Sequence, residues 1–265
     1  MRFTKKLFLY IDKNLLGGKI KLFKTFWKER RLATYKSDEF LYRFVTQYKK
    51  HDASELNILC DKYGSDKGEV TSSGNPYPWF SHNYTEIYEL LFRLSKNNIK
   101  LVIECGLGTN NPGLKSSMGV NGKPGASLRV WRDYFPNAKV IGIDIDKDIL
   151  FSEDRIDTYY CDQTDLRSIA DFTKTAEILE ASIDVIIDDG LHEFEAGKVF
   201  FEGMIKYLSH NGAYIIEDVR ADDILLYKDY FLNISSEFSA QFLSLTRPGI
   251  IEVGDNRLIV VRKNI

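Results

Sequence analysis

The feature that most constrains the fold is a regular alternation of short apolar runs with helical stretches from residue 99 onward. Apolar runs of about four to eight residues, separated by helical periodicity, are typical of β/α units on a mostly parallel sheet. The runs predict strands at 100–105, 139–144, 157–161, 183–188, 212–217, 239–246 and 256–263. The periodicity predicts helices near 126–135, 166–180, 193–208 and 222–235. A short loop with Pro248, Gly249 and Gly254 joins the last two strands, which predicts an antiparallel pair at one edge of a seven-stranded sheet in a three-layer α/β sandwich.

The composition is that of an ordinary globular protein. Apolar residues make up 44% and charged residues 28% of the 265 residues, which excludes disordered, collagen-like and low-complexity chains. No run approaches about 18 consecutive apolar residues, so no membrane-spanning helix is expected. The N-terminus is basic, but Gly17, Gly18 and repeated lysines interrupt its apolar residues, which argues against a secretory signal.

Three cysteines, Cys60, Cys105 and Cys161, form no CxxC pair. An odd number at wide spacing fits neither a disulfide framework nor a zinc site. Free thiols persist in a reducing compartment, so the protein is expected in the cytoplasm.

Charge divides the chain into regions with different tasks. Residues 1–50 hold 14 Lys and Arg against 4 Asp and Glu, whereas the remaining residues hold 22 against 34. The basic region is amphipathic, which predicts a helical extension that packs on the main domain or on another subunit of a homo-oligomer. The alternative is contact with an anionic membrane surface. The acidic remainder argues against nucleic-acid binding, because phosphate-binding surfaces are basic.

Glycines and carboxylates follow the first three predicted strands, where ligands of open parallel sheets bind. The first strand ends in Glu104-Cys105-Gly106-Leu107-Gly108, whose glycines would let backbone N–H groups approach a ligand. The second ends in Asp144-Ile145-Asp146, which could accept hydrogen bonds from ribose hydroxyls. The third ends in Cys161-Asp162-Gln163, which could contact an adenine edge. Together they predict a site for an adenosine-containing cofactor.

Other interpretations of these strand ends exist. Two glycines after a strand are often only a turn. A dinucleotide site, as in a NAD-dependent oxidoreductase, is disfavoured, because position 111 is Asn where GxGxxG needs glycine, and Asp144 stands 38 residues after Gly106 instead of about 20. Asp144-Ile145-Asp146 also spells DxD, a motif of many glycosyltransferases, and that alternative stays open.

Acidic residues and a histidine follow the fourth and fifth predicted strands. The fourth ends in Asp188-Asp189-Gly190-Leu191-His192, and the fifth ends in Glu217-Asp218. Neighbouring strands lie about 4.8 Å apart, so these carboxylates can converge. Carboxylates without thiolates suit a hard cation such as Mg²⁺ or Mn²⁺, and His192 could reach a group bound to that ion.

Two ambiguities remain in this pattern. Adjacent strand residues point to opposite faces, so Glu217 and Asp218 can bind one ion only if the strand has ended or bends there. By the same argument Asp188, beside Asp189, is assigned a structural role. Asp189 could also simply cap the following helix, and His192 could be a partly exposed loop residue.

Several segments, in order along the chain, resemble the metal-dependent sugar O-methyltransferases of the class I S-adenosylmethionine (SAM) fold, the group that includes the macrolide-sugar methyltransferases. They are DKYGSDKG (61–68), HNYTEIYELLF (82–92), VIECGLG (102–108), GASLRVWRDYFPNAKVIGIDID (125–146), DQTD (162–165), IIDDGLHEF (186–194) and YIIEDV (214–219). The resemblance covers roughly residues 55–263, while the insertion at 109–124 and residues 1–50 are poorly matched.

The resemblance implies a SAM-dependent O-methyltransferase that acts on a sugar hydroxyl, with residues 51–98 covering the cofactor and residues 99–265 forming the methyltransferase domain. It implies that Asp189, Glu217 and Asp218 hold Mg²⁺ or Mn²⁺, and that His192, beside Asp189, is the catalytic base. The expected SAM-binding residues are Tyr63, Ser65, Lys67, Glu104, Gly106, Gly108, Ser127, Asp144, Ile145, Asp162, Gln163 and Asp189.

The acceptor is less constrained by these residues. The resemblance suggests a nucleotide-linked sugar, in particular a nucleotide-linked heptose of bacterial surface or capsule polysaccharide. A DxD-type glycosyltransferase and a catalytically silent SAM-binding scaffold are the alternatives. The aromatic side chains of Tyr77, Trp79, Phe80 and Tyr84 are expected to pack in the core or in a lid rather than on a sugar face.

Overall fold

The computed structural model describes residues 45–49, 53–72, 74–234, 236–247 and 254–264. The chain divides into two compact units, 1–47 and 48–265, and the elements given below belong to the second. The predicted basic extension lies almost entirely outside the described residues. Its helical character, its membrane or subunit contacts and the predicted boundaries at residues 50 and 98 therefore stay predictions. Within the described ranges, no helix is both long enough and apolar enough to cross a membrane.

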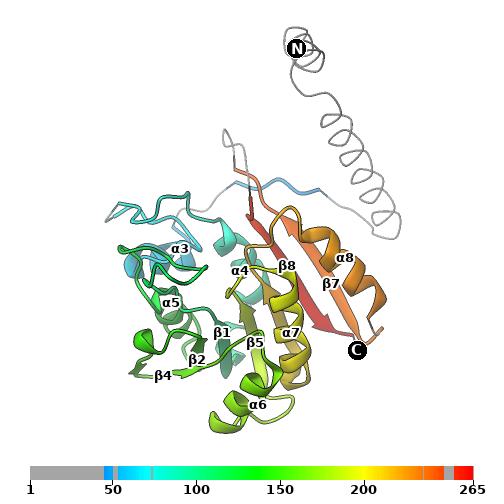
Figure 1. Cartoon of the computed structure of the whole chain (residues 1–265). Helices are drawn as coiled ribbons and strands as arrows, with labels where there is room; N and C mark the ends of the chain where they lie inside the picture. Colours follow the sequence, from blue (N-terminus) through cyan, green and yellow to red (C-terminus); the bar gives the residue numbers. More distant parts are fainter. Residues whose placement is uncertain (1–44, 50–52, 73, 235, 248–253, 265) are drawn as a thin grey trace, which may run out of the picture. The chain divides into compact units, whose positions relative to one another are not determined.

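An eight-stranded sheet forms the middle of the second unit, in the order β3-β4-β2-β1-β5-β6-β8-β7 (Figure 1). Its strands are β1 (Leu101–Cys105), β2 (Lys139–Asp144), β3 (Ser152–Glu153), β4 (Ile156–Tyr160), β5 (Ile183–Asp188), β6 (Leu208–Ile216), β7 (Phe238–Ser244) and β8 (Arg257–Lys263). The strands β4, β2, β1, β5 and β6 are parallel, whereas β8 pairs antiparallel with β6, and β7 with β8. The predicted parallel sheet with an antiparallel edge pair is confirmed.

The predicted count of seven strands is wrong by one edge strand. β3 pairs antiparallel with β4 through only two residues, too few for a periodic pattern to indicate a strand. β6 begins at Leu208, earlier than the predicted start at residue 212. The helix predicted at 166–180 ends at Thr175, because Glu177 and Ala181 adopt positive φ angles of 55° and 56° that a right-handed helix does not allow.

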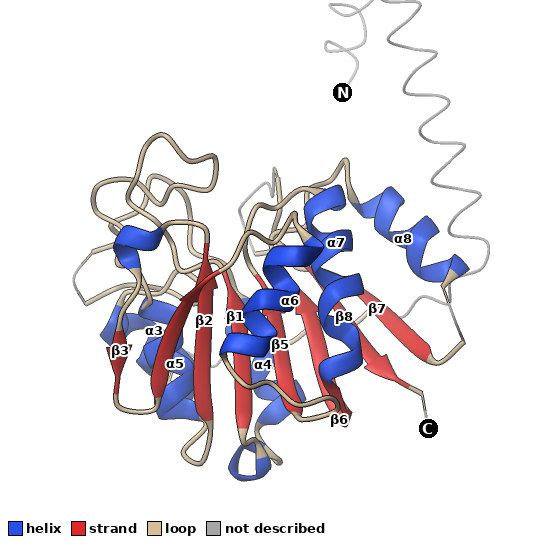
Figure 2. Cartoon of the chain, turned by 60° about the horizontal axis from the view of Figure 1, so that its bottom comes forward, coloured by secondary structure: helices blue, strands red, loops and turns tan. Residues whose placement is uncertain are grey.

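Helices cover both faces of the sheet. They are α3 (Glu55–Tyr63), α4 (Tyr84–Phe92), α5 (Ala126–Tyr134), α6 (Leu166–Thr175), α7 (Phe194–Met204) and α8 (Ile224–Asn233). Figure 2 shows α6, α7 and α8 in front of the sheet and α3, α4 and α5 behind it. Strand residues alternate between the layers: Val102 packs in the cluster of Tyr88 and Trp131, and Ile103 packs in that of Phe200. The predicted three-layer sandwich is confirmed.

The carboxyl ends of the parallel strands meet at one edge of the sheet. Cys105 at the end of β1 lies beside Asp188 at the end of β5, and Asp188 lies beside Ile216 at the end of β6. The residues that follow these three strands are therefore neighbours, although they are far apart in the sequence. This edge is where the sequence predicts the cofactor and metal residues.

Candidate active site

A cavity of about 570 Å³ lies at this edge of the sheet. It is lined by the β1–α5 turn, by the residues after β5 and β6, and by parts of the segment between α3 and α4. The predicted site residues in its wall are Ser65, Lys67, Gly106, Gly108, Ser127, Asp144, Asp189, His192, Glu217 and Asp218. The predicted cofactor and metal residues thus share one cavity.

The turn after β1 requires glycine at its first position. Gly106 has φ 93°, and a Cβ there would lie 2.0 Å from the carbonyl oxygen of Asp189. The turn is tied to β2, because Leu107 N–H donates to Asp144 Oδ2 at 2.7 Å. Gly108 also has a positive φ, of 80°. Close approach of backbone to the cavity follows from these glycines.

The two carboxylates of the DxD segment have different surroundings. Asp144 lines the cavity and accepts the backbone N–H of Asp146 at 2.8 Å. Asp146 does not line the cavity. It accepts the Thr109 hydroxyl and, at 3.0 Å, the backbone N–H of Asp148, and so caps a short 3-10 turn. A shared metal on both carboxylates, as the DxD alternative requires, has no support in this geometry.

Five predicted cofactor residues do not line the cavity. The Tyr63 hydroxyl, at the end of α3, donates to Asp133 of α5 at 2.5 Å. The Ile145 side chain is exposed, and Asp162 accepts the backbone N–H of Thr164. The remaining two are Glu104, which is fully buried and accepts Trp131 Nε1–H, and Gln163, which bonds Asp188 and the Leu191 N–H.

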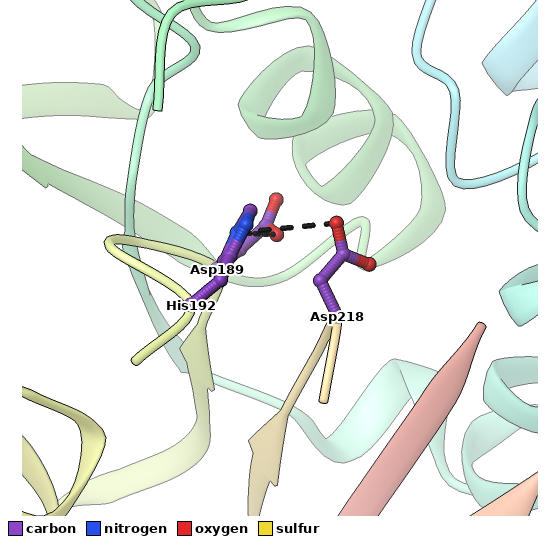
Figure 3. Close-up of side chains that lie close together, drawn as sticks. All are labelled: Asp189, His192 and Asp218. Carbon is purple, nitrogen blue, oxygen red and sulfur yellow. Dashed lines mark hydrogen bonds and ion pairs between the residues drawn. The ribbon is translucent and has the colours of Figure 1, made fainter. Parts of the chain in front are cut away.

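An acidic cluster with a histidine lies in the wall formed by the ends of β5 and β6. One ligand atom each of Asp189, His192 and Asp218 lies within 4.8 Å of the others (Figure 3). His192 Nε2 is 3.2 Å from Asp189 Oδ1 and 3.9 Å from Asp218 Oδ2. Oxygen and imidazole ligands at this spacing suit a divalent cation.

The backbone after β6 explains how two adjacent residues can face one cavity. β6 ends at Ile216, so Glu217 and Asp218 no longer alternate between faces. Asp218 has φ 52°, and His192 has φ 57°. Such left-handed conformations are uncommon outside glycine and often mark functional sites. Glu217 and Asp218 both line the cavity.

Glu217 is bonded through both of its oxygens. Oε1 accepts the Tyr88 hydroxyl, and Oε2 forms an ion pair with Lys67. Among the described residues, the ligand atoms close enough to share one ion belong to Asp189, His192 and Asp218, so this cluster has His192 where the predicted set has Glu217. Burial raises the pKa of Glu217 well above its usual value, although Lys67 counteracts this effect.

Lys67 lines the cavity, and its ammonium group lies among three carboxylates. Lys67 is only 3% exposed. Its Nζ lies 2.6 Å from Asp189 Oδ2 and 3.1 Å from Glu104 Oε1, and it also contacts Glu217. Burial lowers the pKa of the ammonium group, but the three carboxylates outweigh burial and raise it well above the usual value. Lys67 is therefore a permanent internal cation.

The protonation of His192 depends on the same carboxylates. Burial alone would lower its pKa, but the hydrogen bond to Asp189 and the charge of Asp218 raise it to about 10. With its neighbours arranged in this way, the imidazole carries a proton at neutral pH.

Sequence reasoning missed the residues that contact the acidic cluster from α4 and from the residues before it. The Tyr84 hydroxyl donates to Asp218 Oδ1 at 2.6 Å, and His82 Nε2 lies 3.4 Å from the same oxygen. The sequence pointed to them through the matched segment 82–92 and through Tyr84 as a core or lid aromatic, but neither signal indicated a contact with Asp218. Tyr77 is buried, as expected for core packing, but Trp79 and Phe80 are 37% and 67% exposed in the cavity wall.

No protein-family model matches the chain. The chain is 30% identical over 169 residues to the 8-demethyl-8-alpha-L-rhamnosyl tetracenomycin-C 2'-O-methyltransferase of Streptomyces olivaceus, which is 64% of this chain and 39% of that protein. It is 30% identical over 161 residues to the mycinamicin VI 2''-O-methyltransferase of Micromonospora griseorubida, 60% of this chain and 37% of that protein. The chain thus spans less than two fifths of the length of these curated relatives. The predicted resemblance to sugar O-methyltransferases is confirmed.

A solved structure of similar fold is the MycE methyltransferase from the mycinamycin biosynthetic pathway in complex with Mg and SAH. The TM-score is 0.50 at 28% sequence identity, over 62% of this chain and 39% of that one. Together with the sheet order, this similarity confirms the predicted class I methyltransferase fold.

Proposed function

We propose that the protein is a SAM-dependent, metal-dependent O-methyltransferase that acts on a sugar hydroxyl. The observation that carries the proposal is that one cavity joins the glycine turn and Asp144 to the cluster of Asp189, His192 and Asp218. The similarity to sugar O-methyltransferases supports it. MycE, a methyltransferase of this fold, was solved with Mg and SAH, which supports the same two cofactors here.

SAM would be held by the residues of the glycine turn and by Asp144, where it would supply the methyl group. Gly106 and Gly108 allow the backbone close to the cavity, and Asp144 presents a carboxylate suited to ribose hydroxyls. Ser65 and Ser127 lie in the same wall. The SAM contacts predicted for the five residues outside the cavity wall stay predictions: Tyr63, Glu104, Ile145, Asp162 and Gln163. To touch SAM directly, their segments would have to move; otherwise these residues would act through the residues that do line the cavity.

Asp189 and Asp218 would hold Mg²⁺ or Mn²⁺, and Glu217, the third predicted ligand, would stay bonded to Tyr88 and Lys67. The fit rests on the close spacing of their ligand atoms and on the oxygen-rich donor set. When bound, such an ion lowers the pKa of a coordinated hydroxyl group, as it does for bound water. It would also offset the charge of Asp189 and Asp218, which favours the neutral, proton-accepting form of His192.

His192 would then accept the proton of the acceptor hydroxyl, and the oxygen would form its new bond to the methyl carbon as the carbon–sulfur bond breaks. Transfer of a proton to a positioned base typically contributes 10²–10⁴ in rate. Asp189 would hold the imidazole in place through the contact to Nε2, and Lys67 would hold Asp189.

We further propose that the acceptor sugar is linked to a nucleotide. Basic and aromatic side chains in the cavity wall support it: Lys115, Lys123 and Arg247 could meet phosphates, and Trp79 and Phe80 could meet a planar ring. The heptose and the surface-polysaccharide pathway stay predictions. The names of the curated relatives concern sugars attached to antibiotics, such as rhamnosyl tetracenomycin-C and mycinamicin.

A methyl-transfer screen tests the proposal. Labelled SAM is incubated with the protein and with free, nucleotide-linked and antibiotic-linked sugars, once with Mg²⁺ and once with a chelator. We expect transfer to at least one sugar class with Mg²⁺ and little with chelator. Chelator-insensitive transfer would remove the metal from the proposal. SAM binding without transfer to any sugar would favour a scaffold, and binding of a nucleotide sugar without SAM binding would favour a glycosyltransferase.

A further inference from the structure

The first residue of α4 contacts the acidic cluster in a way that the proposed function does not use. Tyr84 is almost fully buried. Its hydroxyl donates to Asp218 Oδ1 at 2.6 Å and accepts the backbone N–H of Asp218 at 3.3 Å. One side chain thus holds both the carboxylate and the backbone of a residue 134 positions away.

Asp218 needs an external partner to keep its direction. Its backbone has φ 52°, a conformation that residues with a side chain rarely adopt unless their surroundings impose it. The residue lies beyond the last residue of β6. Its two neighbours are tied to other strands, Glu217 N–H to Asp188 O at 2.9 Å and Val219 N–H to Arg257 O at 3.3 Å, whereas its own N–H donates to Tyr84. The bond from the Asp218 N–H to Tyr84 is therefore part of what maintains this backbone geometry.

The His82 ring stacks on the ring of Tyr84. The two rings stack with centroids 4.5 Å apart and planes at 14°. His82 Nε2 lies 3.4 Å from Asp218 Oδ1, and its Nδ1 lies 3.3 Å from Asn256 Oδ1. Asp218 Oδ1 is thus engaged by Tyr84 and His82, whereas Oδ2 is on the side of His192, 3.9 Å from Nε2.

We propose that Tyr84 is a positioning residue of the metal site: it engages Asp218 Oδ1 and thereby directs Oδ2 toward the cation. The inference rests on the proposed metal dependence and adds a residue to it that acts through Asp218. Hydrogen-bond partners of metal-binding carboxylates orient them, and their loss typically weakens metal binding by about 10- to 100-fold. A buried tyrosine also needs a hydrogen-bond partner for ordinary stability, so the experiment must separate the two roles.

The experiment titrates Mn²⁺ into the wild type, Tyr84→Phe and Tyr134→Phe and follows the free ion by electron paramagnetic resonance. Tyr134 is the matched control, because it is also fully buried and its hydroxyl donates to a carboxylate, Glu89, that does not line the cavity. Binding of S-adenosylhomocysteine is measured by calorimetry on the same proteins. We expect Tyr84→Phe to bind Mn²⁺ about 10- to 100-fold more weakly, with unchanged S-adenosylhomocysteine affinity, and Tyr134→Phe to bind both as the wild type does.

Unchanged Mn²⁺ affinity in Tyr84→Phe, or an equal loss in Tyr134→Phe, would overturn the positioning role. Wild-type protein that binds S-adenosylhomocysteine but no Mn²⁺ would refute the metal part of the proposed function, and this inference with it. If Tyr84→Phe does not fold, His82→Phe and His82→Gln decide together, because both remove the imidazole contact to Asp218 and only His82→Gln removes the ring that stacks on Tyr84. Mn²⁺ affinity about tenfold lower in His82→Gln than in His82→Phe then supports the proposal, and equal affinities contradict it.

Discussion

Two adjacent aspartates show how one position in a strand changes the chemistry of a side chain. Asp188 is the last residue of β5 and is buried, with Oδ1 accepting a hydrogen bond from Gln163. Asp189 follows the strand and turns into the cavity. Burial raises the pKa of Asp188 to about 6, whereas Lys67 and His192 outweigh burial at Asp189 and lower its pKa. The structural role predicted for Asp188 agrees with this placement.

Asp188→Asn should stabilise the protein at neutral pH. Burial raises the pKa of Asp188 in the folded protein to about 6, above its ordinary value of 3.8, so the folded state binds the proton more tightly than the unfolded state. This carboxyl group therefore lowers stability progressively as pH rises from about 4 to 6, and the full penalty remains above pH 6. Removing the charge should add about 1–2 kcal/mol to the free energy of unfolding at pH 7.5, after the cost of a less satisfied amide.

Urea unfolding of both proteins at pH 4 and pH 7.5, in chelator, measures this difference. The gain should be present at pH 7.5 and largely absent at pH 4. An equal effect at the two pH values would show that the charge of Asp188 is not its cause.

His192→Asn should reduce methyl transfer by about 10²–10⁴-fold, because it removes the proposed base. Asparagine is chosen because it tolerates the positive φ of this position. Steady-state transfer to the acceptor found in the screen measures the effect, and calorimetry should show unchanged binding of S-adenosylhomocysteine. His210→Asn, at an exposed histidine of β6, is the control. Turnover near the wild-type rate in His192→Asn would rule out this base.

At the scale of elements, the β1–α5 turn connects the proposed SAM side of the cavity to the proposed metal side. Gly106 N–H donates to Ile143 O at 2.9 Å, and Asp189 N–H donates to Cys105 O at 2.9 Å. The turn thus packs between β2 and the end of β5 with no room for a side chain. The GxG pattern indicated a ligand-binding turn, but this packing against Asp189 is a tertiary feature.

Gly106→Ala should destabilise the protein much more than an ordinary substitution of a left-handed glycine. Its Cβ would lie 2.0 Å from a backbone oxygen, so the end of β5 must move. Gly119→Ala is the matched control, because Gly119 also has a positive φ, 74°, but no atom within 4 Å of the added Cβ. We expect a loss of about 1–2 kcal/mol for Gly119→Ala and at least about 3 kcal/mol, or failure to fold, for Gly106→Ala. Urea unfolding measures both, and equal losses would contradict the steric argument.

At the scale of the whole molecule, three adjacent parallel strands bring Glu104, Asp189, Glu217 and Asp218 to one sheet edge. Their ordered arrangement depends on Lys67, which contacts the first three of them. A cofactor and a cation that bind the folded state at this edge should therefore stabilise the whole fold.

S-Adenosylhomocysteine and Mg²⁺ should raise the midpoint of thermal unfolding in separate increments. At 100 times the dissociation constant, each ligand adds about 2.7 kcal/mol to stability. Chelator should remove the Mg²⁺ increment only. The variant Asp218→Asn should lose the Mg²⁺ increment and keep the increment from S-adenosylhomocysteine. A Mg²⁺ increment that survives in this variant would place the ion elsewhere, and scanning calorimetry distinguishes the outcomes.

The sequence by itself determined the parallel sheet, its antiparallel edge pair and the edge at which Gly106, Asp144, Asp189 and Asp218 meet. Periodicity and the residues at strand ends are local properties, and parallel strands bring their carboxyl ends together whatever the rest of the chain does. Only the tertiary structure decided that Lys67 lies among carboxylates 122 and 150 positions away, and that Glu217 has both oxygens engaged. The partners of a buried charge depend on which distant segments pack together, and no local pattern of residues carries that information.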